Sequence, residues 1–472
     1  MRTRRLLCLC SLILASLLLS ACRPAIPKIT ADETQRIETL TAKMTPRCVG
    51  RYLIDLPEDF VLNPIHRTLL EGVEIVIEPM ARERFDVRLR ERQSALQNEL
   101  IMGENTPSLL ATMPLSDEAG YVFSRSRNQS SKVLRKLELI AFRDGYMIEV
   151  MVDARDLSQS NRVRENDPRR TDVQAKLDHL LEIYSRLRGR ADNEVPAEAG
   201  VCFANGFLQG EPTDEEQVDL NYHLKTAEDV YFAFHSLSDL IQDDELLDRG
   251  RAIEAMLEME SGYTLRKGSV KGPIPSAQEW LMSKRDTDSG LLYQHFTLEA
   301  NAKTGSAETP VLVVDMNVGV EIPGPVLTLE QAAVRKPLAK TTFGEAQSVA
   351  LWDRTAPTLR PRPVTAPARH LTPVTIKASE TSTAVVPSSA ISPSSPLGVV
   401  SPNDARCPQS GTWQCAVATA LGSTQRTFTV GETLQSVLVP AARSVWQTMV
   451  GAPDNEVTAT TWTLTAYPEK NA

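Results

Sequence analysis

Two short stretches of this chain, "RCVGRYLIDLP" (residues 47–57) and "GVCFANGFLQG" (residues 200–210), begin alike. In each, a cysteine is followed by a short apolar segment. A segment of alternating apolar residues then comes after an interval, "GVEIVIEPM" (72–80) in the first case and "DVYFAFHSL" (229–237) in the second. Such a period of two is typical of a half-buried antiparallel strand. The sequence therefore predicts one fold that occurs twice.

Each half continues in the same order, as a charged amphipathic helix, strands that return as hairpins, and a closing helix. Apolar residues three to seven positions apart indicate the helices, and an Arg-Asp-Gly turn signal at 143–145 indicates one hairpin. The predicted segments are 83–100, 119–127, 136–153 and 172–190 in the first half, and 243–260, 290–300, 309–318 and 343–363 in the second.

This order of segments predicts the α+β class, as two related α+β domains in which helices pack on a mostly antiparallel sheet. We expect the first domain at 46–192 and the second at 200–363, with "NEVPAEAG" (193–200) as the linker between them. Internal duplication is thus the main prediction about the fold.

The composition changes after residue 363. Residues 364–405 are rich in Pro, Ser, Thr and Ala with almost no aromatic residue, which predicts a disordered linker. Residues 406–472 are expected to form a small C-terminal β-rich module. Its tryptophans are expected to form its core, with an exposed aromatic binding strip as the alternative, and they are Trp413, Trp446 and Trp462.

The N-terminus has the pattern of an export signal. Three arginines in the first five residues precede an apolar run that ends in "LSAC" (19–22). The run is shorter than the roughly 20 residues that a membrane-spanning helix needs. It predicts a lipoprotein signal peptide at 1–21, lipidation at Cys22 and an N-terminal tether at 22–45; an ordinary signal peptide is the alternative. The pattern resembles a bacterial lipobox, and Arg23 after the cysteine favours the outer membrane, so we expect a periplasmic, lipid-anchored protein.

Four further cysteines, Cys48, Cys202, Cys407 and Cys415, lie beyond this signal. An even number in an oxidising compartment predicts two disulfides, and four cysteines allow three pairings. Cys407 and Cys415 are close enough in sequence for a local bridge across a hairpin, which leaves Cys48 to pair with Cys202. A Cys48–Cys202 bridge would tie the two opening strands together and restrict the angle between the domains.

The charge is unevenly distributed along the 472 residues, whose net charge is −9. Acids and bases balance between residues 47 and 190, whereas residues 211–260 hold 15 acids against 3 bases. A negative surface of this kind can steer a basic partner, and a solvated helical surface is the alternative. The negative balance argues against a nucleic-acid partner. The predicted partner-binding residues are Asp214, Glu215, Glu216, Asp243, Asp244 and Glu245.

Motifs that would indicate catalysis do not occur in the sequence. The nucleophile elbow G-x-S-x-G, the zinc motif H-E-x-x-H and the glycine-rich phosphate loops are all missing. His235 and His295 lie in predicted strands beside aromatic residues, and we interpret them as structural. No catalytic residue, metal ligand or cofactor is predicted, and we expect a protein that is not an enzyme.

The order of parts resembles the two-domain periplasmic immunity proteins that protect bacteria from type VI secretion lipase effectors. The resemblance covers residues 46–363 and rests on "CVGRYLIDLP" (48–57), "GVCFANGFL" (200–208) and the closing "ALWDRTAPTLRPRP" (350–363). It implies two domains that form a claw around a cognate phospholipase or lipase toxin and block its lid or active-site entrance. The linker and terminal module lie outside the resemblance.

A second hypothesis is an envelope lipoprotein that uses the duplicated fold as a ligand-binding or assembly scaffold. Fold alone does not separate the two hypotheses. A lipase gene beside this gene would favour the immunity hypothesis.

Overall fold

The structure is a computed structural model. It describes residues 26–377 except 65, 103–104, 130, 159–169, 286–289, 321 and 323–337, and it describes residues 400–402, 407, 410–416, 424–429, 432, 434, 437–440, 455–458 and 460–467 of the C-terminal region. The predicted signal peptide and Cys22 lie outside the described residues.

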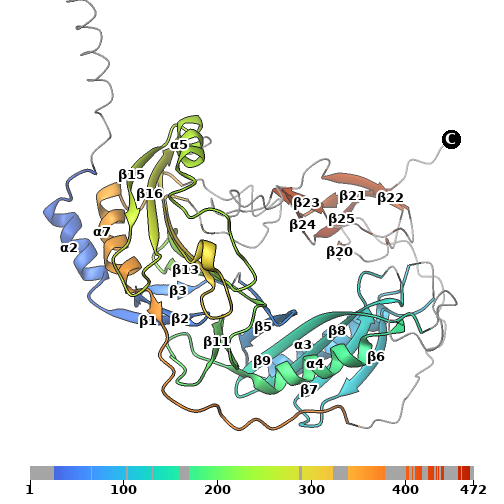
Figure 1. Cartoon of the computed structure of the whole chain (residues 1–472). Helices are drawn as coiled ribbons and strands as arrows, with labels where there is room; N and C mark the ends of the chain where they lie inside the picture. The colour runs from blue at the N-terminus through green and yellow to red at the C-terminus, as the bar shows by residue number, and fades with distance from the viewer. Residues whose placement is uncertain are drawn as a thin grey trace, which may run out of the picture.

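Apart from β3, which occurs only in the first half, the two halves contain equivalent elements in the same order (Figure 1). The first half consists of β1 Met44–Val49, β2 Tyr52–Pro57, β3 Phe60–Leu62, β4 Arg67–Leu70, β5 Val73–Pro79, α3 Arg82–Asn98, β6 Leu109–Pro114, β7 Gly120–Ser126, β8 Leu134–Arg143, β9 Tyr146–Arg155, α4 Val173–Arg186 and β10 Leu187–Gly189. The second half consists of β11 Gly200–Phe203, β12 Gly206–Gln209, β13 Glu216–Leu224, β14 Ala227–Leu237, α5 Gly250–Met259, β15 Tyr263–Ser269, β16 Gln278–Arg285, β17 Leu292–Ala300, β18 Val311–Val318, α7 Glu345–Thr355 and β19 Arg360–Pro361.

The sheets of the two halves are joined into one. From the junction outward, the first half has the strand order β4-β5-β9-β8-β7-β6 and the second has the equivalent order β13-β14-β18-β17-β16-β15. The two equivalent inner strands, β4 and β13, pair antiparallel, with Leu70 opposite Glu216. β3 also pairs with β13, which completes a 13-stranded sheet. This repeated order confirms the internal duplication that the opening segments predict.

The halves also exchange their last strands. β10, which ends the first half, pairs with the hairpin β11–β12 that opens the second half. β19, which ends the second half, pairs with β2 of the hairpin that opens the first. Because each small sheet contains strands from both halves, the predicted boundaries separate two sequence repeats that are interlocked in space.

The helices cover the sheet in an equivalent way in both halves. α4 and α7 belong to the main core, into which each sends wholly buried apolar side chains, such as Leu180 and Leu351. α3 and α5 pack on smaller clusters, around Phe123 and Trp280 respectively. The predicted hairpin turn is present, with Asp144 at φ 50° and Gly145 at φ 83°, a left-handed region that glycine enters readily.

The predicted N-terminal tether contains a helix. α2 (Ala31–Leu40) begins with a capping box in which the Thr30 and Glu33 side chains satisfy each other's backbone groups. Ile37 is fully buried, and the Arg36 guanidinium lies 4.7 Å from the centre of the Phe343 ring. The prediction of a simple tether is therefore wrong for residues 31–40, because one apolar side chain of α2 enters the core beside α7.

The start of the predicted disordered linker is also ordered. Residues 364–377, which we call the strap, run from the second half beneath the junction towards the first half (Figure 1). Gln209 and the backbone of Arg369 exchange hydrogen bonds of 3.0 and 2.9 Å, and Val374 is buried in the main core. The composition predicted disorder, but the strap finds its backbone partners on both halves.

The C-terminal module contains a four-stranded sheet with the order β20-β25-β21-β22, and β23 pairs with β24. Its strands are β20 Val400–Pro402, β21 Gly411–Cys415, β22 Gln425–Phe428, β23 Val437–Pro440, β24 Asn455–Thr458 and β25 Thr461–Ala466. Trp413 and Trp462 are fully buried, which confirms them as core residues and not an exposed strip. Trp446 lies outside the described residues.

The predicted bridge between Cys407 and Cys415 is not formed, and both side chains are buried thiols. β21, which ends at Cys415, forms its hairpin with β22, and the backbone of Cys407 donates instead to Glu432. Cys407 therefore does not lie across that hairpin from Cys415. The second predicted disulfide, Cys48–Cys202, is present.

Candidate partner-binding surface

The acidic residues before β13 divide into two kinds. Asp214 and Glu215 are exposed, whereas Glu216 is 5% exposed. Both carboxylate oxygens of Glu216 accept hydrogen bonds from the Arg51 guanidinium, at 3.0 and 2.7 Å. Such a two-pronged, buried ion pair holds the two halves together. The prediction that Glu216 binds a partner is therefore wrong, because its carboxylate is already used inside the protein.

The acidic residues after β14 show the same division. Asp243 and Asp244 are exposed on the segment between β14 and α5. Glu245 is half-buried, and its carboxylate accepts a hydrogen bond of 2.5 Å from the Gln278 side chain. Glu245 therefore helps to position the segment that precedes α5, whereas its two neighbours face solvent.

Strand register brings the two exposed acidic groups to the same end of the sheet. Gln217, near the start of β13, lies opposite Leu237, the last residue of β14. The Gln217 side chain also donates to the carboxylate of Asp239, which is exposed. The residues that precede β13 and those that follow β14 therefore lie at the same end of these two strands. We call the exposed acids Asp214, Glu215, Asp239, Asp243 and Asp244 the acidic end.

Two exposed apolar side chains of the second half were not identified from the sequence. Ile241, between Asp239 and Asp243 in the sequence, is 70% exposed, and Met259, the last residue of α5, is 81% exposed. Single exposed apolar side chains are normal on a monomer, whereas contiguous apolar patches mark contact sites. Position 259 lies about 120° around α5 from Ile253, outside the face that packs on the sheet, which is a signal available in the sequence.

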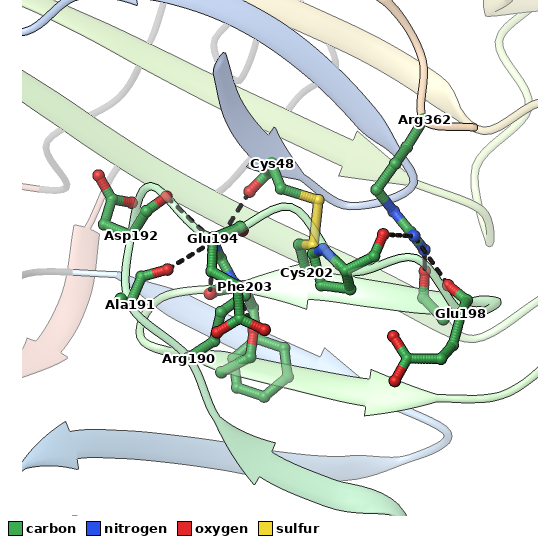
Figure 2. The surroundings of a disulfide bond; sticks show 12 residues. Cys48, Arg190, Ala191, Asp192, Glu194, Glu198, Cys202, Phe203 and Arg362 are labelled. Carbon is green, nitrogen blue, oxygen red and sulfur yellow. Dashed lines mark hydrogen bonds between the residues drawn. A yellow bond between two sulfur atoms is a disulfide. The ribbon is translucent and has the colours of Figure 1, made fainter. Parts of the chain in front are cut away.

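The junction behind these surfaces is held by the Cys48–Cys202 disulfide, whose Cα atoms are 5.6 Å apart (Figure 2). Two buried arginines lie on either side of it. Arg190 donates to several backbone carbonyls, including that of Glu194 at 2.7 Å, and Arg362 donates to that of Gly200 at 2.7 Å. Burial lowers the pKa of Arg190, and burial with the charge of Arg51 lowers the pKa of Arg362 to about 10.

The two histidines that we interpret as structural both form side-chain hydrogen bonds, partly buried for His235 and buried for His295. The Nδ1 atom of His235 lies 2.6 Å from Asp219, and that of His295 lies 2.7 Å from Asn317. Burial lowers the pKa of His235, but the hydrogen bond and charge of Asp219 outweigh it, and the net effect is to raise the pKa. These contacts support the structural interpretation.

The described part of the chain contains cavities as well as exposed surface, among them one of about 580 Å³ beside α2. No group of three or more His, Cys, Asp or Glu side chains there is arranged to hold a metal ion. A cavity of about 590 Å³ lies beside the strap, but its arginines are engaged by carboxylates, as Arg143 is by Asp117 and Arg369 by Glu198. Within the same described residues, no helix has the length and apolar character needed to cross a membrane.

Comparison with known protein families decides the identity of the duplicated region. The family model of the Tle cognate immunity protein 4 N-terminal domain matches residues 45–190, and that of its C-terminal domain matches residues 194–364. The chain belongs to this family. Members of the family are immunity proteins and not enzymes. The strap, apart from its first residue, and the C-terminal module lie outside the matched residues.

Two solved structures have the same fold. One is the apo structure of immunity protein TplEi of the type VI secretion system from Pseudomonas aeruginosa, with a TM-score of 0.51 and 19% identity over 68% of this chain and 97% of that chain. The other is the Tle4–Tli4 complex, with a TM-score of 0.50 and 19% identity over 68% of this chain and 98% of the matched chain. No curated protein matches the sequence.

Proposed function

We propose that this protein binds a cognate type VI lipase effector in the periplasm and inhibits it by covering its active-site entrance or lid. The observation that carries the proposal is the match of both halves to one immunity family. A similar fold occurs in a solved Tle4–Tli4 complex. Inhibition by covering an entrance needs no catalytic group in the inhibitor; it needs only a large complementary surface.

The architecture supplies a surface of the required kind. The two halves extend from a junction that is fixed by a disulfide, exchanged strands and the Arg51–Glu216 ion pair (Figure 1). A stable protein complex buries about 1,200–2,000 Å² in total. A rigid junction lowers the entropy that is lost when such a surface is formed, because the binding residues are already in place. The acidic end would then accelerate encounter with a basic partner.

The test is co-purification with the lipase whose gene adjoins this one, followed by an assay of phospholipid hydrolysis. We expect a stable complex in which hydrolysis is lost at saturating immunity protein. A lipase that remains fully active at saturation would rule out inhibition. If it binds without losing activity, the envelope-scaffold hypothesis gains support.

We also propose that the protein is anchored to the outer membrane through lipid on Cys22. Fractionation of cells that carry Cys22→Ala tests this part separately. The variant should leave the membrane fraction and still bind the lipase, because the anchor lies outside both matched domains. Unchanged membrane attachment would refute the anchor and leave the immunity function standing.

A further inference from the structure

Helix α5 carries more apolar surface than the sheet beneath it covers. Ile253 and Leu257 point into the cluster around Trp280 and are almost completely buried. At about 100° per residue, these two side chains occupy an arc of about 40°. They account for the packing of α5 on the second half.

The remaining apolar residues of α5 extend this arc into solvent. Ala252, Ala255 and Met259 are exposed, and Met256 is half-buried. With Ile253 and Leu257 they form an apolar arc of about 200°, whereas a helix on a globular surface needs only about 100°. We call Ala252, Ala255, Met256 and Met259 the outer stripe. Figure 1 shows α5 at the far end of the second half, above β15 and β16.

The exposed charges that precede and follow the outer stripe in the sequence are mostly negative. Glu258 and Glu260 are exposed at the C-terminal end of α5, where Glu260 pairs with Lys284 at 2.6 Å, and Asp243 and Asp244 are exposed on the segment that leads into the N-terminal end of the helix. Arg251 is the one base within α5 itself. An apolar centre with a charged rim is the usual arrangement of a protein interface. The rim here fits a partner surface whose own rim is basic.

We propose that the outer stripe is a docking site for the cognate effector, through an apolar patch of that effector bordered by lysine or arginine. The proposal rests on the proposed function and adds the contacting residues. Methionine suits this role because its flexible, polarisable side chain adapts to the shape of an apolar partner. The acidic rim selects the partner by charge, and the stripe supplies apolar area at the centre of the contact.

The experiment compares two matched variants of the full chain, solubilised in detergent, in binding to the purified lipase of the adjoining gene. Met259→Glu places a charge in the outer stripe. Val87→Glu makes the same change at a 44% exposed position on α3 of the first half and serves as the control. We expect Met259→Glu to raise the Kd about tenfold or more, which is the effect of a substitution at the centre of an interface. Val87→Glu should change the Kd less than about twofold.

A second pair of measurements separates charge from apolar contact. Asp243→Lys combined with Asp244→Lys should slow association about tenfold at low salt and much less at high salt, because long-range attraction is screened. Thermal melting of each variant checks folding, and if Met259→Glu is unstable, Met259→Ser replaces it. Because position 259 is exposed, we expect unchanged melting.

The outcomes distinguish this proposal from the proposed function. Failure of the unaltered protein to bind the lipase would overturn the proposed function itself. Normal binding by both the unaltered protein and Met259→Glu would overturn only the docking site. The alternative partner of the outer stripe is a second copy of this chain, and sedimentation velocity tests for it. If the unaltered chain forms a dimer that Met259→Glu dissociates, and lipase affinity is unchanged, the stripe serves self-association and the proposal is refuted.

Discussion

Arg190 and Arg362 hold equivalent places in the two halves, each directly after the exchanged strand. Both end a Leu-Arg-x-Arg segment, at 187–190 and 359–362. The backbone N–H of Arg190 donates to Asn205 at 2.8 Å, and that of Arg362 donates to Arg51 at 2.9 Å. Both acceptors lie in the turn of the other half's opening hairpin. The duplication therefore includes the residues that interlock the halves.

Arg362→Ala should lower the free energy of unfolding by about 3–5 kcal/mol, because it removes a buried donor that several backbone carbonyls share. The guanidinium donates to Pro196 at 2.5 Å, to Glu198 at 2.7 Å and to Gly200 at 2.7 Å. Urea denaturation measures the effect. Arg360→Ala is the control, since that half-exposed side chain pairs with Asp55 at the surface and should cost below about 1 kcal/mol. Equal losses in the two variants would contradict this account.

Reduction of the Cys48–Cys202 bridge should destabilise the protein by about 2–5 kcal/mol, because the bridge closes a loop of 154 residues. Thermal melting with and without reductant tests this. The double variant Cys48→Ala/Cys202→Ala should melt at the lower temperature in both buffers. If reductant lowers the melting temperature of the double variant as well, the loss of stability does not come from the Cys48–Cys202 bridge.

Much of the duplicated fold could be predicted from sequence because its signals are local. Period-two strands and amphipathic helices recur in order, and the structure places several of them as predicted, as in α3 and β9. The helix predicted at 243–260 begins only at Gly250, and the one predicted at 343–363 ends at Thr355 and is followed by β19. The exchange of end strands could not be predicted, since the three residues 187–189 carry no pattern and gain their partners only across the junction.

The candidate surface was predicted in part, for a similar reason. Charge alone cannot separate Glu215 from Glu216, because the partner of Glu216 is Arg51, 165 residues away in the sequence. The strap shows the converse. Its composition indicates disorder, and a few long-range contacts, such as the burial of Val374, override it.

Glu149→Gln should stabilise the protein at pH 8 and have little effect at pH 5. Burial, with the charge of Glu138, raises the pKa of Glu149 to about 7. The folded protein then binds a proton that the unfolded chain has already released between pH 4.5 and 7, so this group lowers stability as pH rises through that window. We expect the variant to gain about 2 kcal/mol at pH 8.

Chemical denaturation at both pH values measures this effect. Glu228→Gln is the control, because Glu228 is exposed on β14 of the other half and its charge is not among those that act on Glu149, so its change should be small and similar at the two pH values. A gain from Glu149→Gln that is equal at pH 5 and pH 8 would show that ionisation of Glu149 is not its cause.

The substitutions Glu215→Ala and Glu216→Ala, at adjacent positions, should affect different properties of the protein. Glu216→Ala leaves the Arg51 guanidinium buried without its carboxylate and should cost about 3 kcal/mol of stability. Glu215→Ala removes an exposed charge from the acidic end. It should change the free energy of unfolding by less than about 0.5 kcal/mol and slow association with the lipase at low salt. Melting curves and stopped-flow or surface-based association rates measure the two effects. If Glu215→Ala is the less stable variant, or if it leaves the association rate unchanged at every salt concentration, the division between structural and surface acids at this edge is wrong.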